Sequence, residues 1–405
     1  MDIFIARQPI FDTRQNVYGY ELLYRQGTHS NAFNSAVDAD EASSKVMVDS
    51  FLDIGINKIT DGKKAFVNFT KNLIMNESAT LFSKDTLVVE VLETIQPTPE
   101  IVEKCKKLKD QGYLIALDDF VFSKEFIPLI GIADIIKIDF LITPEAELEK
   151  YFKIIGKTRI KFLAEKVETR EVYNLALSMG FAYFQGYFFS KPVILSEKSI
   201  SPMKMNYIRI LKLLNSPELD FNALGAIISQ DLALSYKLLK LVNSAAFGTR
   251  NRIGQVNLAL SYLGEREIRK WISLIVMMGI SAENPQEVLL LSLVRAKFSE
   301  LLAPPFQMGI QKEALFIMGL FSLMDTLVNQ PIDVILKDIP LEDSIEKALV
   351  EDRGPFAPVL NFVRAYEQGD WESVRSLSQT HHLSDELIQA SYLDSLEWAK
   401  ELNML

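Results

Sequence analysis

Seven apolar runs in the first half of the chain each carry a polar side chain of a kind that can do chemistry. The polar residues are Glu21, Asn68, Glu90, the pair Asp118 and Asp119, Lys137, Glu165 and Gln185. Counted from Asp118 for the pair, their residue numbers differ by 47, 22, 28, 19, 28 and 20. A step of about 20–30 residues is one strand and one helix of a barrel that takes roughly 200 or more residues in all. In such a barrel, polar residues at the carboxyl ends of the strands meet at one mouth, so the spacing predicts a shared site.

The charges of this predicted site favour divalent cations. The carboxylates that would gather there are Glu21, Glu90, Asp118, Asp119, Glu165 and Glu168, against the single ammonium of Lys137. Crowded carboxylates repel one another, so some must bind protons or meet cations. Oxygen ligands suit Mg²⁺ or Mn²⁺, and adjacent aspartates favour two ions that together activate a water for attack on a phosphodiester. Any one of these residues alone is more often an ion-pair partner or a strand-end cap, and the spacing by itself leaves the reaction open.

The elements that would position these residues alternate between strands and helices. Short runs rich in Val, Ile and Phe cover residues 65–69, 86–91, 113–117, 134–138 and 160–164. Such runs are typical of strands buried on both faces. Residues 99–112 and 169–180 show helical spacing and end in glycine, a common helix stop. The alternation predicts βα units and a mostly parallel sheet, and hence an α/β TIM-like barrel.

The pattern changes after Ser201 and Pro202, where the strand signal disappears. Apolar residues then recur at helical spacing, for example in the run from Trp271 to Met278. The segment from Asp385 to Leu402 predicts a final amphipathic helix. We therefore predict two domains, a barrel over residues 1–195 and an all-helical domain with a helical tail over residues 200–405.

Composition excludes several classes of protein. The net charge of the 405 residues is −10, without the basic stripe of a protein that binds a DNA duplex. The longest candidate membrane run, Trp271 to Ile280, is about half of the ~20 residues that span a bilayer. The N-terminus has no basic leader with an apolar stretch, so no signal peptide is expected. The single cysteine, Cys105, is interpreted as a tolerated thiol of a reducing cytosol rather than a reactive one. We expect a cytoplasmic protein without a membrane or duplex partner.

The local sequences around the seven runs resemble the EAL domain family, over almost all of residues 1–195. The matching segments are Gln8-Pro9-Ile10, Glu21-Leu22-Leu23-Tyr24-Arg25, Val67-Asn68-Phe69-Thr70, Glu90-Val91-Leu92-Glu93, Asp118-Asp119-Phe120, Lys137-Ile138-Asp139, Ala164-Glu165-Lys166-Val167-Glu168-Thr169 and Gln185-Gly186-Tyr187-Phe188-Phe189-Ser190-Lys191-Pro192. The resemblance implies the barrel fold of a phosphodiesterase that binds cyclic di-GMP and hydrolyses it to the linear dinucleotide pGpG with two Mg²⁺ or Mn²⁺ ions.

The resemblance also implies a role for each matching residue. The implied metal ligands are Glu21, Asn68, Glu90 and Asp118 for one ion, with Asp118 and Asp119 holding or bridging to the second. Glu165 and Lys137 would position or deprotonate the attacking water. The implied contacts to the dinucleotide come from Gln8, Arg25 and Asp139, and the supporting residues are Glu93, Glu168 and Gln185. Glu21 and Arg25 share one face of an extended strand, because side chains alternate along it.

Two departures from the family pattern keep a second function open. The family usually continues after Asp119-Phe120 with Gly-Thr-Gly-Tyr-Ser, in a loop that orders the second ion and a dimer contact, and this chain has Val121-Phe122-Ser123-Lys124-Glu125. Lys166 stands where the family has glycine. The leading hypothesis is an active phosphodiesterase, with a homodimer as one expectation. The alternative is a cyclic di-GMP receptor that signals without turnover, and a scaffold that binds no nucleotide is a third.

The second half resembles the HDOD domain, a helical relative of the HD phosphohydrolases, over roughly residues 200–330. The similar segments are 224–235, 237–248 and 259–269. HD enzymes bind metal through histidine and aspartate, and the three histidines here are His29, His381 and His382. The resemblance therefore implies a domain without catalysis that binds a protein partner still to be identified. Asn243 and Ser244 are interpreted as a cap or turn.

Overall fold

The computed structural model describes residues 3–26, 55–120, 123–155, 158–186, 202–244, 247, 252–281, 284–328, 330–339 and 341–403. Its contacts divide the chain into two compact units. Unit 1 comprises Met1–Phe189 together with Arg364–Leu393, and unit 2 comprises Ser190–Val363 together with Asp394–Leu405. This division differs from the sequence-based ranges 1–195 and 200–405 in two respects. The boundary lies after residue 189, and residues 364–393 group with the first unit.

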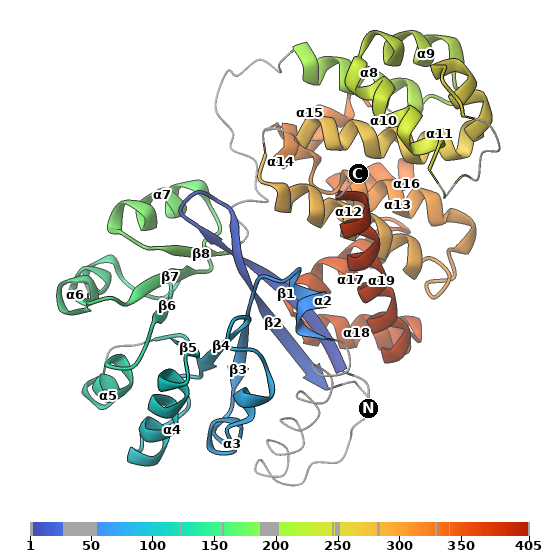
Figure 1. Ribbon diagram of the computed structural model, residues 1–405. Coiled ribbons are helices and arrows are strands. Elements are labelled where there is room, and N and C mark those ends of the chain that lie inside the picture. The colour runs from blue at the N-terminus through green and yellow to red at the C-terminus, as the bar shows by residue number, and fades with distance from the viewer. Residues whose placement is uncertain are drawn as a thin grey trace. The chain divides into compact units, whose positions relative to one another are not determined.

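Unit 1 is built on a closed barrel of eight strands in sequence order (Figure 1). The strands are β1 (Ile3–Asp12), β2 (Val17–Gln26), β3 (Lys64–Phe69), β4 (Leu87–Val91), β5 (Leu114–Leu117), β6 (Ile135–Asp139), β7 (Lys161–Glu165) and β8 (Tyr183–Gln185). The five predicted apolar runs are confirmed as strands. Strands β2 to β8 pair in parallel, whereas β1 runs antiparallel to both of its neighbours, β2 and β8. The barrel fold is confirmed, and the antiparallel first strand was not predicted.

Helices connect the parallel strands on the outside of the barrel (Figure 1). They are α2 (Ile56–Thr60), α3 (Lys71–Met75), α4 (Pro99–Asp110), α5 (Ile127–Ile130), α6 (Glu145–Ile155) and α7 (Arg170–Met179), with short 3₁₀ turns η1 (Ser78–Leu81) and η2 (Lys124–Phe126). Helix α7 is capped at its start by Thr169, whose side chain accepts a hydrogen bond from the amide of Val172, and at its end by Gly180 in the left-handed region with φ 95°. The glycine stop is confirmed there, since only glycine adopts this conformation without strain.

An apolar layer fills the barrel, and a polar layer lies directly above it. The buried apolar layer consists of Ile10, Phe66, Val88, Ala116, Ile135 and Leu163. Side chains two residues apart on a strand point to the same face. The residues two positions closer to the mouth on these strands are Gln8, Asn68, Glu90, Asp118, Lys137 and Glu165. Because side chains two residues apart share a face, the buried hydrophobic ring is followed by a ring of polar side chains two residues closer to the mouth.

Residues 364–393 complete unit 1 through contacts with the first hairpin. They span the end of α17 (Ala357–Gln368), all of α18 (Trp371–His381) and the start of α19 (Asp385–Asn403). Tyr366 is fully buried, its hydroxyl donates to the carbonyl of Ile5 at 3.2 Å, and its ring packs against Trp371. A Cβ on Gly369, whose φ is 68°, would lie 2.6 Å from Leu23 Cδ1. The first hairpin thus packs against a segment more than 300 residues away in sequence.

Unit 2 is helical, as the sequence predicted. Its helices are α8 (Pro202–Leu214), α9 (Phe221–Gln230), α10 (Leu232–Val242), α11 (Val256–Ile280), α12 (Gln286–Leu302), α13 (Lys312–Phe321), α14 (Met324–Val328), α15 (Ile332–Leu336) and α16 (Asp343–Val350), with the 3₁₀ turn η5 (Gly309–Gln311) and the remaining parts of α17 and α19. Asn243 ends α10 as a cap, as predicted, and also bonds both the amide and the carbonyl of Ile253 at 2.8 Å. The apolar run from Trp271 to Ile280 is the mostly buried end of α11. In the part of the chain that is described, no helix has both the length and the apolar character of a membrane span.

Candidate active site at the barrel mouth

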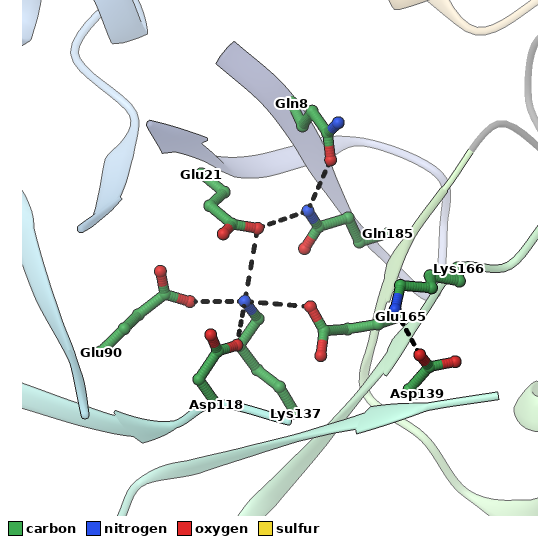
Figure 2. Close-up of polar contacts among 9 residues, drawn as sticks. All are labelled: Gln8, Glu21, Glu90, Asp118, Lys137, Asp139, Glu165, Lys166 and Gln185. Atoms are coloured by element: carbon green, nitrogen blue, oxygen red, sulfur yellow. Dashed lines mark hydrogen bonds and ion pairs between the residues drawn. The ribbon is translucent and has the colours of Figure 1, made fainter. Parts of the chain in front are cut away.

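The ammonium of Lys137 lies at the centre of the polar layer (Figure 2). Four carboxylate oxygens from four strands or strand ends surround Nζ, at 2.7 Å for Asp118, 2.9 Å for Glu90, 3.0 Å for Glu165 and 3.3 Å for Glu21. The lysine side chain is fully buried and so is that of Glu90. A buried charge is tolerated only when it is paired, and here one cation is shared among four anions. The parallel register of β4 to β7 places Glu90, Asp118, Lys137 and Glu165 at the same level along the barrel axis.

Two amide side chains extend this cluster toward β1. Gln185 Nε2 donates to Glu21 Oε2 at 2.6 Å and to Gln8 Oε1 at 3.0 Å (Figure 2). Gln8 in turn donates to the main-chain carbonyl of Gln368 at 3.1 Å. The bonds form a continuous chain from residue 368 through two glutamines to a carboxylate beside Lys137. This chain orients the carboxylate of Glu21 before any ligand binds.

Several buried oxygen atoms of the mouth make no hydrogen bond within the described residues. They are Asn68 Oδ1, Glu90 Oε2, Glu165 Oε2 and Gln185 Oε1. A buried oxygen without a partner is costly, about 1–3 kcal/mol for a neutral group and more for a charged one. Oxygen atoms of carboxylates and amides are the ligands that Mg²⁺ and Mn²⁺ prefer. The donor set therefore fits a hard divalent cation, which would satisfy these atoms together.

The crowding of carboxylates shifts the titration of the cluster. Burial raises the pKa of Glu90 well above its ordinary value, and Lys137 opposes this only in part. Burial also raises the pKa of Glu165, to about 8, against the attraction of Lys137. For Lys137, burial acts to lower the pKa, but the four carboxylates together raise it well above the ordinary value. In the absence of a divalent cation, the two buried carboxyl groups of Glu90 and Glu165 thus bind protons more readily than isolated ones do, which relieves the crowding of negative charge.

A second, outer group of charges lies beside this cluster. It comprises Asp119, Asp139 and Lys166. The carboxylate of Asp139 is buried, accepts from the amide of Leu141 at 2.7 Å and forms an ion pair with the ammonium of Lys166 (Figure 2). Burial raises the pKa of the half-buried Asp119, Asp118 raises it further, and Lys166 acts in the opposite direction. Lys166 and Asp119 both have positive φ, 52° and 40°, which is unusual for residues with side chains.

The structure brings only part of the predicted set to the central lysine. Within the described residues, Glu93 and Glu168 are exposed and are not among the carboxylates that pair with Lys137. Asn68 lies beside Glu90 in the register of β3 and β4. The backbone of Arg25 belongs to β2, but its side chain lies outside the described residues, as do Val121 and Phe122. The roles assigned to all these residues stay predictions.

The carboxylates are not arranged as a ready-made metal site. Among the described residues, no group of three or more histidine, cysteine or acidic side chains is placed to hold a metal ion. The physical reason is visible in Figure 2, where the ammonium of Lys137 lies between the carboxylates.

Two contacts escaped the sequence-based prediction. The ion pair of Lys166 with Asp139 is one of them. Its only signal in the sequence is a lysine at a position where the family has glycine, and that signal does not name the partner. The bond from Gln8 to Gln368 had no local signal, because the two residues are 360 positions apart.

Comparisons with known proteins decide the family. The model of the EAL domain matches residues 2–192, and the model of the HDOD domain matches residues 200–329. A Bacillus subtilis protein, the uncharacterized protein YuxH, is 37% identical over 99% of both chains. The chain belongs to the EAL–HDOD family. The family expected from the sequence is thereby confirmed.

A second relative carries a functional name. It is the cyclic di-GMP phosphodiesterase CdgJ of Vibrio cholerae, 34% identical over 99% of this chain and 93% of its own length. Among solved structures, Klebsiella pneumoniae BlrP1 in a complex with calcium and cyclic di-GMP aligns with a TM-score of 0.40 and 22% identity. That alignment covers 47% of this EAL–HDOD chain and 56% of BlrP1.

Proposed function

We propose that this protein is a cyclic di-GMP phosphodiesterase that forms linear pGpG with the help of divalent cations. The observation that carries the proposal is the cluster of four carboxylates around Lys137 at the barrel mouth, with buried oxygens that lack a hydrogen bond. Family membership and the name of the Vibrio cholerae relative support the same substrate.

The residues of the mouth divide the work of hydrolysis. Glu21, Asn68, Glu90 and Asp118 would hold one Mg²⁺ or Mn²⁺ ion, and the family arrangement would place a second ion at Asp118 and Asp119. Such an ion supplies charge stabilisation at the phosphoryl oxygens and lowers the pKa of a bound water. Glu165 accepts a proton from the attacking water, whose oxygen forms a bond to phosphorus as the bond to the 3′ oxygen breaks. The 3′ oxygen takes up a proton from solvent and becomes the free 3′ hydroxyl of pGpG. The positive charge of Lys137 holds the carboxylate of Glu165 in place through their ion pair. It also stabilises the negative charge that develops on the phosphate in the transition state.

The remaining predicted residues would bind the dinucleotide or support the cluster. Gln8 is half-buried in the polar layer, where its amide can meet the substrate. Arg25 would offer a guanidinium fork to a phosphate, the geometry that guanidinium groups favour. Gln185 supports Glu21 directly through its hydrogen bond. Glu93, Glu168 and Asp139 keep the supporting or binding roles that the resemblance implies.

One assay tests the proposal. The purified full chain is incubated with cyclic di-GMP and Mn²⁺ or Mg²⁺, and the products are separated by chromatography. We expect pGpG from the wild type, its loss with EDTA, and its loss in Glu21→Gln, which keeps the shape of the side chain but removes the ligand charge. Glu77→Gln is the matched control, because Glu77 pairs with Lys104 and Lys107 away from the cluster. Absence of metal-dependent product from the wild type would contradict the proposal.

The same protein samples test the receptor alternative. Binding of cyclic di-GMP without product, measured by calorimetry, would support a receptor that signals through the helical domain. Absence of cyclic di-GMP binding would leave the third hypothesis, a scaffold that binds no nucleotide. The two departures from the family, the loop after Phe120 and Lys166, are the features that keep the receptor hypothesis open.

We further infer that the HDOD domain binds a protein partner and carries no catalysis. Its sequence between residues 200 and 380 contains no histidine, which HD enzymes need for metal. A homodimer through the barrel is the other association that the family implies. Size-exclusion chromatography with light scattering on the full chain tests the homodimer, and a mass near 46 kDa would exclude it.

A further inference from the structure

The charged residues of the mouth form two groups that differ in how completely they are neutralised. The inner group contains Glu21, Glu90, Asp118 and Glu165 around Lys137, so that four carboxylates share one ammonium. The outer group contains Asp119 and Asp139 with Lys166, whose ammonium forms an ion pair with Asp139 and attracts Asp119. When all groups are charged, the inner group carries three excess negative charges and the outer group carries one.

The two groups also differ in free ligand atoms. The inner group has buried oxygens without hydrogen bonds on Glu90 and Glu165, within the described residues. In the outer group, Asp139 Oδ1 accepts from the amide of Leu141 and Asp139 Oδ2 accepts from Lys166. Both oxygens of the buried outer carboxylate are therefore occupied by donors of this chain. The inner group therefore combines the larger excess of negative charge with buried open oxygen atoms, and both favour a divalent cation.

The backbone directs Lys166 toward the outer group. Lys166 follows Glu165, the last residue of β7, and its φ of 52° is a conformation that glycine adopts without strain and lysine does not. Its side chain is 54% exposed, yet its ammonium pairs with a carboxylate that is 2% exposed. Lys166 is also close enough to Asp119 and Glu165 for both to raise its pKa, after the larger effect of its bond to Asp139. The side chain of Lys166 is thus partly exposed to solvent, while its ammonium lies among the carboxylates of the outer group.

We propose that the ammonium of Lys166 takes the place of a second divalent cation, so that the mouth binds one Mg²⁺ or Mn²⁺ ion at the inner group instead of two. A second divalent ion at Asp118 and Asp119 would lie beside the positive charge of Lys166, which is paired with the neighbouring Asp139 and attracts Asp119. Like charges a few ångström apart repel strongly where water is excluded. The inference rests on the proposed function for its metal ion, and it concerns the number of ions rather than the reaction.

Calorimetry with Mn²⁺ and no nucleotide measures the number of ions directly. We expect one ion per chain for the wild type, one for Lys166→Arg, which keeps the positive charge, and two for Lys166→Gly, which removes it and suits the backbone. Lys166→Met removes the charge but keeps the bulk, so that it also gains the second ion if charge is the cause. Electron paramagnetic resonance of the loaded proteins gives a second readout, because two neighbouring Mn²⁺ ions are coupled and a single ion is not.

The control variant separates the charge from the backbone effect. Gln15 also has positive φ, 61°, in the turn between β1 and β2, so Gln15→Gly relieves the same strain in the barrel without removing a charge. It should bind one ion, as the wild type does. Two ions in the wild type would overturn the inference, and so would one ion in both Lys166→Gly and Lys166→Met. No bound ion in any variant would overturn it as well.

Failure of the inference and failure of the proposed function give different results. Two bound ions together with metal-dependent pGpG would reject the role of Lys166 and keep the phosphodiesterase. One bound ion in the wild type and two in the lysine variants, without product from any of them, would keep the role of Lys166 and reject the hydrolytic function.

Discussion

At the residue scale, the feature that distinguishes this mouth is a buried lysine shared by four carboxylates. Burying each charge costs desolvation free energy, and only close pairing with opposite charges offsets this cost. Lys137 is fully buried and all four pairs lie within 3.3 Å. A site kept at this cost is more consistent with chemistry than with stability.

Glu165→Gln should separate binding from chemistry. Glutamine keeps the size of the side chain but cannot accept the proton from water. We expect kcat for cyclic di-GMP to fall by about 10²–10⁴-fold, the usual contribution of a general base, with the dissociation constant for the dinucleotide little changed. Steady-state kinetics and calorimetry measure the two quantities. Equal loss of binding and turnover would argue against the role of Glu165 as the base.

Lys137→Met should destabilise the metal-free protein. Without the ammonium, four carboxylates face one another with no internal cation, and breaking a buried pair typically costs about 3–5 kcal/mol. We expect a loss of this size in EDTA, measured by urea unfolding, and a larger stabilisation by Mn²⁺ than in the wild type. Lys63→Met, at an exposed position, is the matched control and should change stability by no more than about 0.5 kcal/mol. An unchanged stability of Lys137→Met would mean that the carboxylates are protonated in the folded protein.

Cys105 should be unreactive in the folded protein. Its side chain is buried on α4, and burial raises the pKa of the thiol to about 11. The thiolate, which is the reactive form, is therefore rare at pH 8 as well as inaccessible. We expect no reaction with Ellman's reagent under native conditions and one equivalent in guanidinium chloride. Rapid reaction of the native protein would instead support the reactive-thiol interpretation.

At the scale of elements, close approach of backbones limits which side chains are tolerated. Helices α12 and α13 pack at Gly319, where a Cβ would lie 2.4 Å from the carbonyl oxygen of Arg295. Strand β8 ends similarly at Gly186, whose φ is 139° and whose Cβ would lie 2.3 Å from the carbonyl oxygen of Val167. Glycine is required at both places by space, and at Gly186 by conformation as well.

Gly319→Ala should loosen the helical unit. The added methyl group would press on the main chain of α12, which cannot move as a side chain can. Overpacking of this kind typically costs about 1–3 kcal/mol. Chemical unfolding followed by circular dichroism measures the loss. Gly254→Ala is the control, because no heavy atom lies within 4 Å of its added Cβ, and it should be close to neutral.

At the scale of the whole molecule, the barrel unit is completed by residues from near the end of the chain. Residues 364–393 belong to this unit by their contacts, and they include the buried Tyr366. Gln368 contributes a main-chain carbonyl to Gln8. The first hairpin of the barrel therefore depends on a segment that lies beyond the matched HDOD range of 200–329.

Tyr366→Ala should weaken the barrel itself. Truncation of a large buried aromatic side chain typically costs about 3–5 kcal/mol, and here the bond to the carbonyl of Ile5 is lost as well. Hydrogen exchange measured by mass spectrometry should show faster exchange across β1. Tyr236→Ala, at a 63% exposed position of α10, is the control. Unchanged protection of β1 in Tyr366→Ala would show that the C-terminal segment does not stabilise the hairpin.

The sequence by itself determined the family, the barrel and the helical second half. Parallel strands buried on both faces appear as short apolar runs, such as residues 134–138, and Glu90, Asp118, Lys137 and Glu165 each follow a core residue by the strand period of two. Glu21, Glu90, Asp118, Lys137 and Glu165 could be placed at one mouth for this reason, since strand order and period are local properties of the chain.

Only the tertiary structure decided which charges pair and which segments complete the barrel. The four anions of Lys137 span 144 positions of sequence, from Glu21 to Glu165, and their distances depend on the register of all the strands between them. The pair of Lys166 with Asp139 depends on a left-handed backbone, and the bond of Gln8 to Gln368 on the packing of residues 364–393. Ion pairs and packing act through space, so no local pattern of residues encodes them.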